Sequence, residues 1–143
     1  MRYETGNMKK LLFFILCMFM SGVANAVPAV VDYHFDGDTF SAGVMLDTDV
    51  EITVRVRLIN IDTPEINGKC AAEKVMAQSA RDLLTTIIPR GTVVDLQNIK
   101  DDKYLGRINA NVILPDGRDV GQIMIDSGLA RPYSGGKRQP WCK

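Results

Sequence analysis

The chain has 143 residues, of which 46% are hydrophobic, and this is enough for one domain of ordinary size with a packed core. Its 17 basic and 17 acidic residues give a formal net charge of zero. The whole molecule therefore has no general attraction for a polyanion, and any affinity for phosphate must come from a local cluster of charges.

The N-terminal segment has the pattern of a secretory signal peptide. Lys9 and Lys10 precede an apolar run over residues 11–20, and Ala24–Ala26 has the small-x-small form of a cleavage site. A membrane anchor is the alternative, but a span needs about 20 apolar residues and polar residues interrupt this run sooner. We expect residues 1–26 to be a signal peptide. The mature part, residues 27–143, would then be exported to a periplasm or secreted, without stable membrane association.

The rest of the chain alternates short strand patterns with two helical ones. Glu51–Ile59 is the clearest strand, with its aliphatic residues at every second position. The order is three strands, a long helix, two strands and a short helix, over residues 30–35, 40–46, 51–59, 70–88, 92–99, 108–114 and 120–127. This order predicts a mainly β fold with helices (α+β), a five-stranded Greek-key barrel of the OB type with one long inserted helix. An unrelated α+β sandwich is the alternative.

Export would leave two cysteines, Cys70 and Cys142, which can pair in only one way. We therefore predict a structural disulfide between them. A catalytic thiol would need a histidine partner, and His34 is the only histidine in the chain. We interpret His34 as an ordinary strand residue.

Two acidic motifs occur where strands are expected to end. Asp36-Gly37-Asp38-Thr39 lies between the first two predicted strands, where a plain hairpin turn is the alternative interpretation. Asp62-Thr63-Pro64-Glu65 follows the third strand, and its alternative is the start of a helix with proline in the first turn.

Two arginines accompany these acids. Arg57 lies on the strand that leads to the second motif, and Arg107 follows Gly106 at the start of the fifth predicted strand. A guanidinium group offers a planar pair of donors that matches two phosphate oxygens. The alternative for both is a solvated side chain or a simple ion-pair partner. A lone histidine and the absence of clustered cysteines disfavour zinc, whereas aspartates with a backbone carbonyl suit Ca²⁺ better than Mg²⁺.

The motifs together resemble those of staphylococcal nuclease (thermonuclease-like) domains, over about residues 31–133. The resemblance is carried by Asp-Gly-Asp-Thr at 36–39, by Arg-Leu-x-x-x-Asp-Thr-Pro-Glu at 57–65, by Asp-Lys-Tyr followed by Gly-Arg within 102–107, and by Gly-Leu-Ala at 128–130. It implies an OB-type barrel and a Ca²⁺-dependent nuclease that acts on DNA and RNA with little sequence preference. In this chemistry water attacks phosphorus and expels the 5′-oxygen, which leaves a 3′-phosphate.

The resemblance also implies a role for each matched residue. Asp38, Asp62 and the carbonyl of Thr63 would bind Ca²⁺, and Asp36 would be an outer-shell acid. Glu65 would activate or orient the attacking water, and Arg57 and Arg107 would bind the phosphate and stabilise its transition state. Lys103 and Tyr104 would flank the bound nucleotide, and Tyr133 would take the place of a base-stacking tyrosine.

The chain departs from the family pattern in three segments. Leu105 is an insertion between Tyr104 and Gly106, and the segment of residues 66–69 before the long helix is short. The end of the chain has a glycine pair in place of a third long helix. It carries four cations and no acid from position 127 onward (Arg131, Lys137, Arg138 and Lys143), so this tail is either a solvated end or a contact for a polyanion.

Two rival hypotheses belong to other functional classes. A noncatalytic OB-type module would bind single strands or another anion without hydrolysing them. A structural domain of the cell envelope would account for export and a disulfide, but not for the acids and arginines together. The default expectation for the oligomeric state is a monomer.

Overall fold

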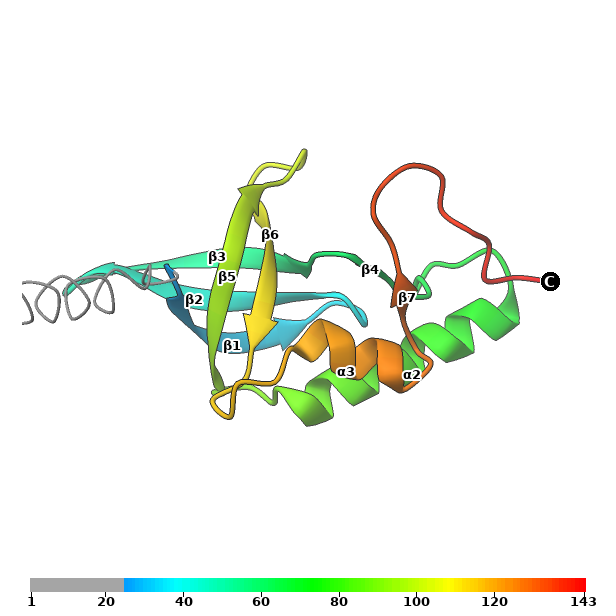
Figure 1. Cartoon of the computed structure of the whole chain (residues 1–143), viewed down its shortest axis with the longest axis horizontal. Coiled ribbons are helices and arrows are strands. Elements are labelled where there is room, and N and C mark those ends of the chain that lie inside the picture. The colour runs from blue at the N-terminus through cyan, green and yellow to red at the C-terminus, as the bar shows by residue number, and fades with distance from the viewer. Residues whose placement is uncertain (1–24) are drawn as a thin grey trace, which may run out of the picture.

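The computed structural model of the protein describes residues 25–143 (Figure 1). The predicted signal peptide, apart from its last two residues, lies outside the described residues. The first strand begins at Val27.

Five strands close into a barrel in the spatial order β1-β2-β3-β6-β5. Strand β3 pairs with β6 in parallel, and the other four pairs, including the closing pair of β1 and β5, are antiparallel. This is the predicted α+β fold with an OB-type barrel, and it excludes the sandwich alternative. The strand bounds are β1 Val27–His34, β2 Thr39–Asp47, β3 Val50–Leu58, β5 Val93–Asp101 and β6 Arg107–Ile113.

Two helices, α2 (Ala71–Ile87) and α3 (Val120–Asp126), lie side by side at one end of the barrel (Figure 1). Helix α3 begins at a cap, because the side chain of Asp119 accepts a hydrogen bond from the backbone N–H of Gln122, and the chain leaves it through Gly128 at φ +81°. Neither helix of residues 25–143 has the length and apolarity that a bilayer span requires.

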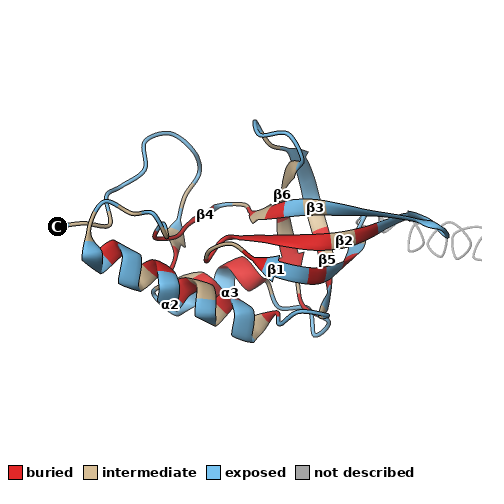
Figure 2. Cartoon of the chain, turned by 180° about the vertical axis from the view of Figure 1, so that it is seen from behind, coloured by how far each residue is buried: buried red, intermediate tan, exposed pale blue. Residues whose placement is uncertain are grey.

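The core fills the barrel and continues beneath the helices. Phe40 and Leu96 line the barrel interior, and Leu84 of α2 and Met124 of α3 are fully buried against the same cluster. Figure 2 shows this burial along β2 and on the inner faces of both helices. The predicted alternation of Glu51–Ile59 is only partly reflected in burial. Val56 is buried, but Ile52 is exposed because the tip of the β2–β3 hairpin lacks cover.

The sequence pattern did not predict two short strands, β4 (Ile61–Asp62) and β7 (Arg131–Pro132), which pair with each other. The chain turns from β3 into β4 through Asn60 at φ +64°, a left-handed conformation that asparagine tolerates better than most residues. The pairing places the end of the chain beside the second acidic motif, because Arg131 is the register partner of Asp62.

Candidate active site

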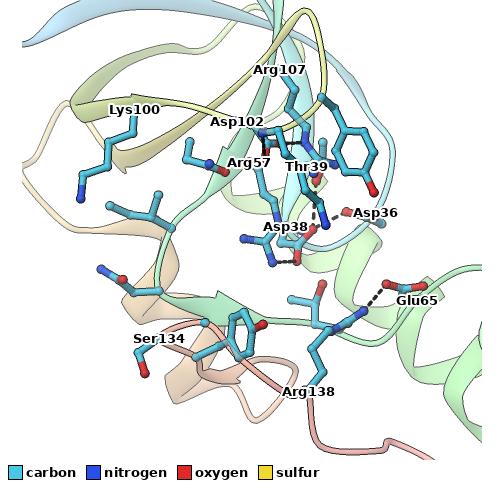
Figure 3. Close-up of a pocket in the computed structure, with 18 residues that line it drawn as sticks. Asp36, Asp38, Thr39, Arg57, Glu65, Lys100, Asp102, Arg107, Ser134 and Arg138 are labelled. Carbon is cyan, nitrogen blue, oxygen red and sulfur yellow. Dashed lines mark hydrogen bonds and ion pairs between the residues drawn. The ribbon is translucent and has the colours of Figure 1, made fainter.

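A cleft of about 570 Å³ opens between the β5–β6 connection, the turns that follow β1 and β3, and the C-terminal segment (Figure 3). It brings together nearly all the predicted site residues, and its arginines lie beside its acids. The predicted residues that line it are Asp36, Asp38, Arg57, Thr63, Glu65, Lys103, Tyr104, Arg107 and Tyr133. Asp62 is the exception, since its side chain is only 2% exposed and lies behind the cleft wall.

The turn that carries Asp36 and Asp38 is fixed by backbone contacts at both ends. Phe35 N–H donates to the carbonyl of Thr39 (2.9 Å), and Leu58 N–H donates to the carbonyl of Asp38 (2.8 Å). Inside the turn, the side chain of Asp36 accepts from the backbone N–H of Asp38 (3.1 Å). The motif is thus more than an exposed hairpin turn, because β3 and the turn together aim two carboxylates into the cleft.

Gly37 allows this turn to lie directly on α2. A Cβ atom at this position would lie 2.6 Å from the Cβ of Ala80 and 3.3 Å from the Cβ of Thr63. Such a contact is too close for any residue other than glycine. The requirement for glycine therefore comes from the approach of the first acidic motif to the helix and to the second motif.

The surroundings of Asp36 in this turn disfavour its ionised form. Burial raises the pKa of Asp36 to about 7, and the neighbouring carboxylate of Asp38 adds to the rise. Asp38 is itself 7% exposed and accepts a hydrogen bond from the hydroxyl of Thr39 (2.9 Å). The turn therefore holds two carboxyl groups close together at the cleft, both largely shielded from water.

Arg57 reaches the acids because of strand register. In the β2–β3 ladder its partner is Thr39, so its side chain lies beside Asp38, with Nη2 3.7 Å from Oδ2. Nη2 also donates to the carbonyl of Ile61 (3.4 Å), and the side chain is 22% exposed. Arg57 is therefore held in place at the cleft wall and remains open on one side.

Arg107 stands at the start of β6, where it forms an ion pair with Asp102 and stacks on Tyr104 at 4.4 Å from the ring centroid. Burial would raise the pKa of Asp102, but hydrogen bonds led by that from Arg107 outweigh it and hold the pKa below its ordinary value. Lys103 also approaches the Tyr104 ring (5.1 Å), while the inserted Leu105 points into solvent. The insertion thus leaves Arg107 and Tyr104 together at the cleft.

Asn109 and Tyr133 complete the wall near Arg57. Asn109 is the register partner of Arg57 across the parallel β3–β6 pair, and its Oδ1 is buried without a hydrogen-bond partner among the described residues. Tyr133 N–H donates to the carbonyl of Asn60 (3.0 Å), which places the ring at the cleft. Both residues offer contacts for a bound group.

The second acidic motif is not the start of a helix, because α2 begins at Ala71. Asp62 belongs to β4, Thr63 is buried, and the Glu65 side chain is 54% exposed at the cleft mouth. The helix-start alternative is therefore wrong. The motif is the segment in which the chain leaves the sheet, and its residues Thr63 and Glu65 line the cleft.

The C-terminal segment, residues 133–143, adds a residue to the cleft, Arg138, that was not predicted as part of the site. Arg138 binds both motif acids and the backbone between them. Its Nε donates to Asp62 Oδ1 (2.6 Å), its Nη2 to the Thr63 carbonyl (3.1 Å), and its Nη1 to Glu65. Burial would lower the pKa of Arg138, but the hydrogen bonds to Glu65 and Asp62 outweigh this and raise it. The feature of the sequence that could have pointed to Arg138 is the cluster of cations after position 127.

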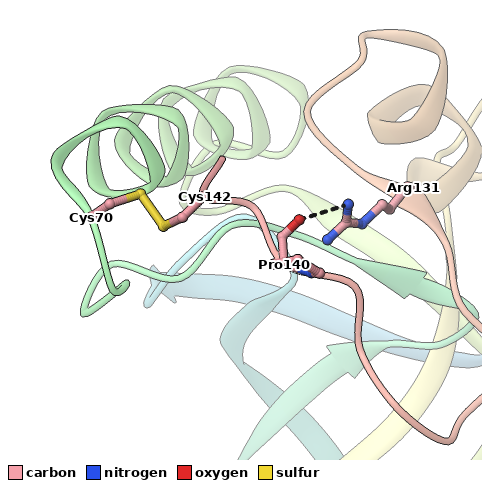
Figure 4. The surroundings of a disulfide bond; sticks show 4 residues. All are labelled: Cys70, Arg131, Pro140 and Cys142. Atoms are coloured by element: carbon pink, nitrogen blue, oxygen red, sulfur yellow. Dashed lines mark hydrogen bonds between the residues drawn. A yellow bond between two sulfur atoms is a disulfide. The ribbon is translucent and has the colours of Figure 1, made fainter.

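The predicted disulfide between Cys70 and Cys142 is present and joins this segment to the residue that precedes α2 (Figure 4). Arg131 also holds the segment, because its guanidinium donates to the carbonyls of Gln139 and Pro140 and stacks on Trp141 at 3.9 Å. Trp141 in turn donates its indole N–H to Asp62 Oδ2 (3.0 Å). The segment is thus folded around the buried aspartate.

The oxygens predicted to bind a metal fit a hard cation. Within residues 25–143, no three His, Cys, Asp or Glu side chains gather into a ready metal cluster. However, Asp62 Oδ1, the Thr63 carbonyl and Glu65 all contact one guanidinium, so these oxygens already converge on one positive group. The carboxylate of Asp38 lines the same cleft. Carboxylate and carbonyl oxygens are the ligands that Ca²⁺ prefers.

Comparison with known proteins agrees with this geometry. The staphylococcal nuclease homologue family matches residues 55–140. The chain belongs to this family. The segment matched to the staphylococcal nuclease homologues contains Arg57, Glu65, Arg107 and Arg138, whereas the turn with Asp36 and Asp38 precedes it.

Two relatives carry the name uncharacterized endonuclease. One, from Escherichia coli, is 33% identical over 98 residues, which are 68% of this chain and 56% of the relative. The other, from Escherichia coli O157:H7, is 32% identical over an equal span. The chain therefore matches little more than half the length of these relatives.

Proposed function

We propose that this protein is an exported, Ca²⁺-dependent nuclease that hydrolyses phosphodiester bonds of DNA and RNA with little sequence preference. The observation that carries the proposal is one cleft lined by both Arg57 and Arg107 and by the acids Asp36, Asp38 and Glu65. Family membership and the printed names of the relatives support the same reaction class.

The chemistry follows from charge. A phosphodiester is anionic and repels a nucleophile, so the guanidiniums of Arg57 and Arg107 would bind its oxygens and stabilise the charge that builds in the transition state. Glu65 would accept a proton from the attacking water or orient it. Attack on phosphorus then breaks the bond to the 5′-oxygen and leaves a 3′-phosphate.

The metal would be held by Asp38, Asp62 and the carbonyl of Thr63, with Asp36 in the outer shell. Bound Ca²⁺ would supply positive charge next to the reacting phosphate. Lys103, Tyr104 and Tyr133 line the cleft where the neighbouring nucleotides would lie. A flat ring and a cation contact any base or phosphate, which is consistent with weak sequence preference.

Export is a separate part of the proposal. The first strand starts at Val27, directly after the predicted cleavage site, and a disulfide is expected in an oxidising compartment. We expect the mass of the protein purified from culture medium or periplasm to correspond to a chain that begins at Val27. A full-length chain that stays in the cytoplasm would contradict this part.

The nuclease reaction can be tested with purified residues 27–143 and either plasmid DNA, denatured DNA or RNA. We expect cleavage with CaCl₂ and none after a chelator is added. Glu65→Gln should reduce the rate by about 100-fold or more, because a general base contributes roughly 10²–10⁴. Arg90→Ala is the matched control, since Arg90 is exposed and pairs with Asp32 away from the cleft.

The same assay distinguishes the proposed nuclease from the alternative, a noncatalytic module. A module that only binds nucleic acid would retard the substrate on a gel in every condition and leave its length unchanged. That result would overturn the proposed reaction.

A further inference from the structure

The guanidinium of Arg138 occupies the oxygens that the proposed Ca²⁺ site needs. Nε and Nη2 use Asp62 Oδ1 and the carbonyl of Thr63, two of the three predicted ligands, and Nη1 binds Glu65. Ca²⁺ and this guanidinium are both cations, and each needs the same lone pairs. They therefore exclude each other from these oxygens.

We propose that Arg138 is a built-in competitor of Ca²⁺ and sets the affinity of the site for the ion. The proposal rests on the Ca²⁺ site of the proposed function. In this view the metal binds Asp62 and Thr63 only after the Arg138 side chain has left them. Departure of Arg138 also frees Glu65, so metal binding and the availability of the general base are coupled.

The residues around Arg138 hold its guanidinium group in a fixed position. The disulfide ties Cys142 to Cys70, and Arg131 binds the carbonyls of Gln139 and Pro140 immediately after Arg138. A tethered group competes at a high effective concentration, because it cannot diffuse away from its site. The side chain itself is 38% exposed, so it has open space into which it can turn.

The other contacts of Asp62 suit the replacement of Arg138 by Ca²⁺ at its Oδ1 atom. Its Oδ2 is bound by the indole N–H of Trp141 (3.0 Å) and lies 3.5 Å from Nη2 of Arg131, contacts that do not involve Arg138. These donors fix the carboxylate while Oδ1 is free to change partners. Loss of Arg138 therefore leaves Asp62 oriented and still partly neutralised.

The chain offers a matched control beside the residue itself. Lys137 carries the same charge, is exposed in the same segment, and has no ion pair among the described residues. Lys137→Gln removes one positive charge near the site without vacating its oxygens. Comparison with Arg138→Gln therefore separates competition for the ligands from a general change in the electrostatic field.

The test is calorimetric titration of CaCl₂ into residues 27–143 without nucleic acid, for wild type, Arg138→Gln, Lys137→Gln and Asp38→Asn. We expect Arg138→Gln to bind Ca²⁺ at least about fivefold more tightly than wild type, the lower end of common coupling strengths. Lys137→Gln should bind like wild type, and Asp38→Asn should bind more weakly. Circular dichroism of each variant checks that it is folded.

Equal Ca²⁺ affinity in wild type and Arg138→Gln, with weaker binding by Asp38→Asn, would overturn the competition while the Ca²⁺ site stands. An equal gain in Lys137→Gln would also overturn it, because the effect would then be one of net charge. Absence of Ca²⁺ binding in every protein would overturn both the competition and the Ca²⁺ dependence of the proposed function.

A second set of variants tests whether the disulfide holds Arg138 at its position. The double variant Cys70→Ser/Cys142→Ser should move Ca²⁺ affinity in the same direction as Arg138→Gln, and Arg138→Gln should add less in that background than in wild type. Full additivity of the two changes would overturn the role of the disulfide in holding the competitor.

Discussion

At the scale of single residues, the site depends on registers that place each charge. Arg57 lies beside Asp38 because Thr39 is its partner in the β2–β3 ladder, and Asn109 lies beside Arg57 because β3 and β6 are parallel. A shift of one residue in either ladder would turn these side chains to the other face of the sheet. Strand register therefore places Arg57 between Asp38 and Asn109.

Asn60 is the residue whose backbone makes the second motif possible. Its φ of +64° turns the chain from β3 into β4, and its carbonyl accepts from Tyr133 N–H (3.0 Å). We expect Asn60→Val to lower the free energy of unfolding by about 1–3 kcal/mol, since a β-branched residue is strained in this conformation. Urea denaturation measures the change. Asn60→Gly is the control and should be far milder; equal losses in both variants would show that backbone conformation is not the cause.

At the scale of elements, the contact between the first acidic motif and α2 leaves no room for a side chain at Gly37. Gly37→Ala would bring a Cβ to 2.6 Å from that of Ala80, so the turn or the helix must move. We expect a loss of about 1–3 kcal/mol in the free energy of unfolding, as for other overpacked sites.

A second substitution tests whether contact with the Cβ of Ala80 is the reason why position 37 needs glycine. In the Gly37→Ala background, Ala80→Gly removes the opposing Cβ and should recover part of the loss, although glycine within a helix costs about 1 kcal/mol by itself. If Ala80→Gly lowers stability by the same amount in both backgrounds, the contact does not explain the need for glycine. Thermal denaturation of wild type, the two single variants and the double variant completes this double-mutant cycle.

His34 links β1 to the end of α2, because its Nε2–H donates to the carbonyl of Ile88 (2.8 Å) and its side chain is buried. Burial lowers the pKa of His34 below 6.5, a trend that the Ile88 carbonyl opposes and the charge of Arg81 reinforces. The unfolded chain therefore takes up this proton at a higher pH than the folded chain does.

The resulting contribution of His34 to stability is complete above pH 6.5 and is lost as the pH falls from there toward the folded pKa. We expect the difference in unfolding free energy between wild type and His34→Gln to shrink over this range, as measured by urea denaturation at several pH values. A difference that stays constant with pH, or grows as the pH falls, would contradict a neutral, buried imidazole.

At the scale of the whole molecule, the sequence patterns predicted much of the fold and most of the residues that line the cleft. The alternation in Glu51–Ile59 is a local signal, so this strand could be predicted from the sequence. Strands β4 and β7 have two residues each, which is too short for any periodicity, and they exist only because distant segments pair. Arg138 was missed for a related reason. Its partner Asp62 lies 76 positions away, and the contact depends on the path that a loop and a disulfide impose.

In the proposed function, the arginines and acids of a single cleft act together to hydrolyse nucleic acid. The most direct measurement is single-turnover cleavage of a labelled single-stranded oligonucleotide with saturating CaCl₂, by wild type and Arg57→Ala, with binding measured on the same samples. We predict that Arg57→Ala binds the oligonucleotide and cleaves it about 100-fold more slowly or worse, since it loses a transition-state contact. Equal cleavage rates, or binding without cleavage by the wild-type protein, would contradict the claim.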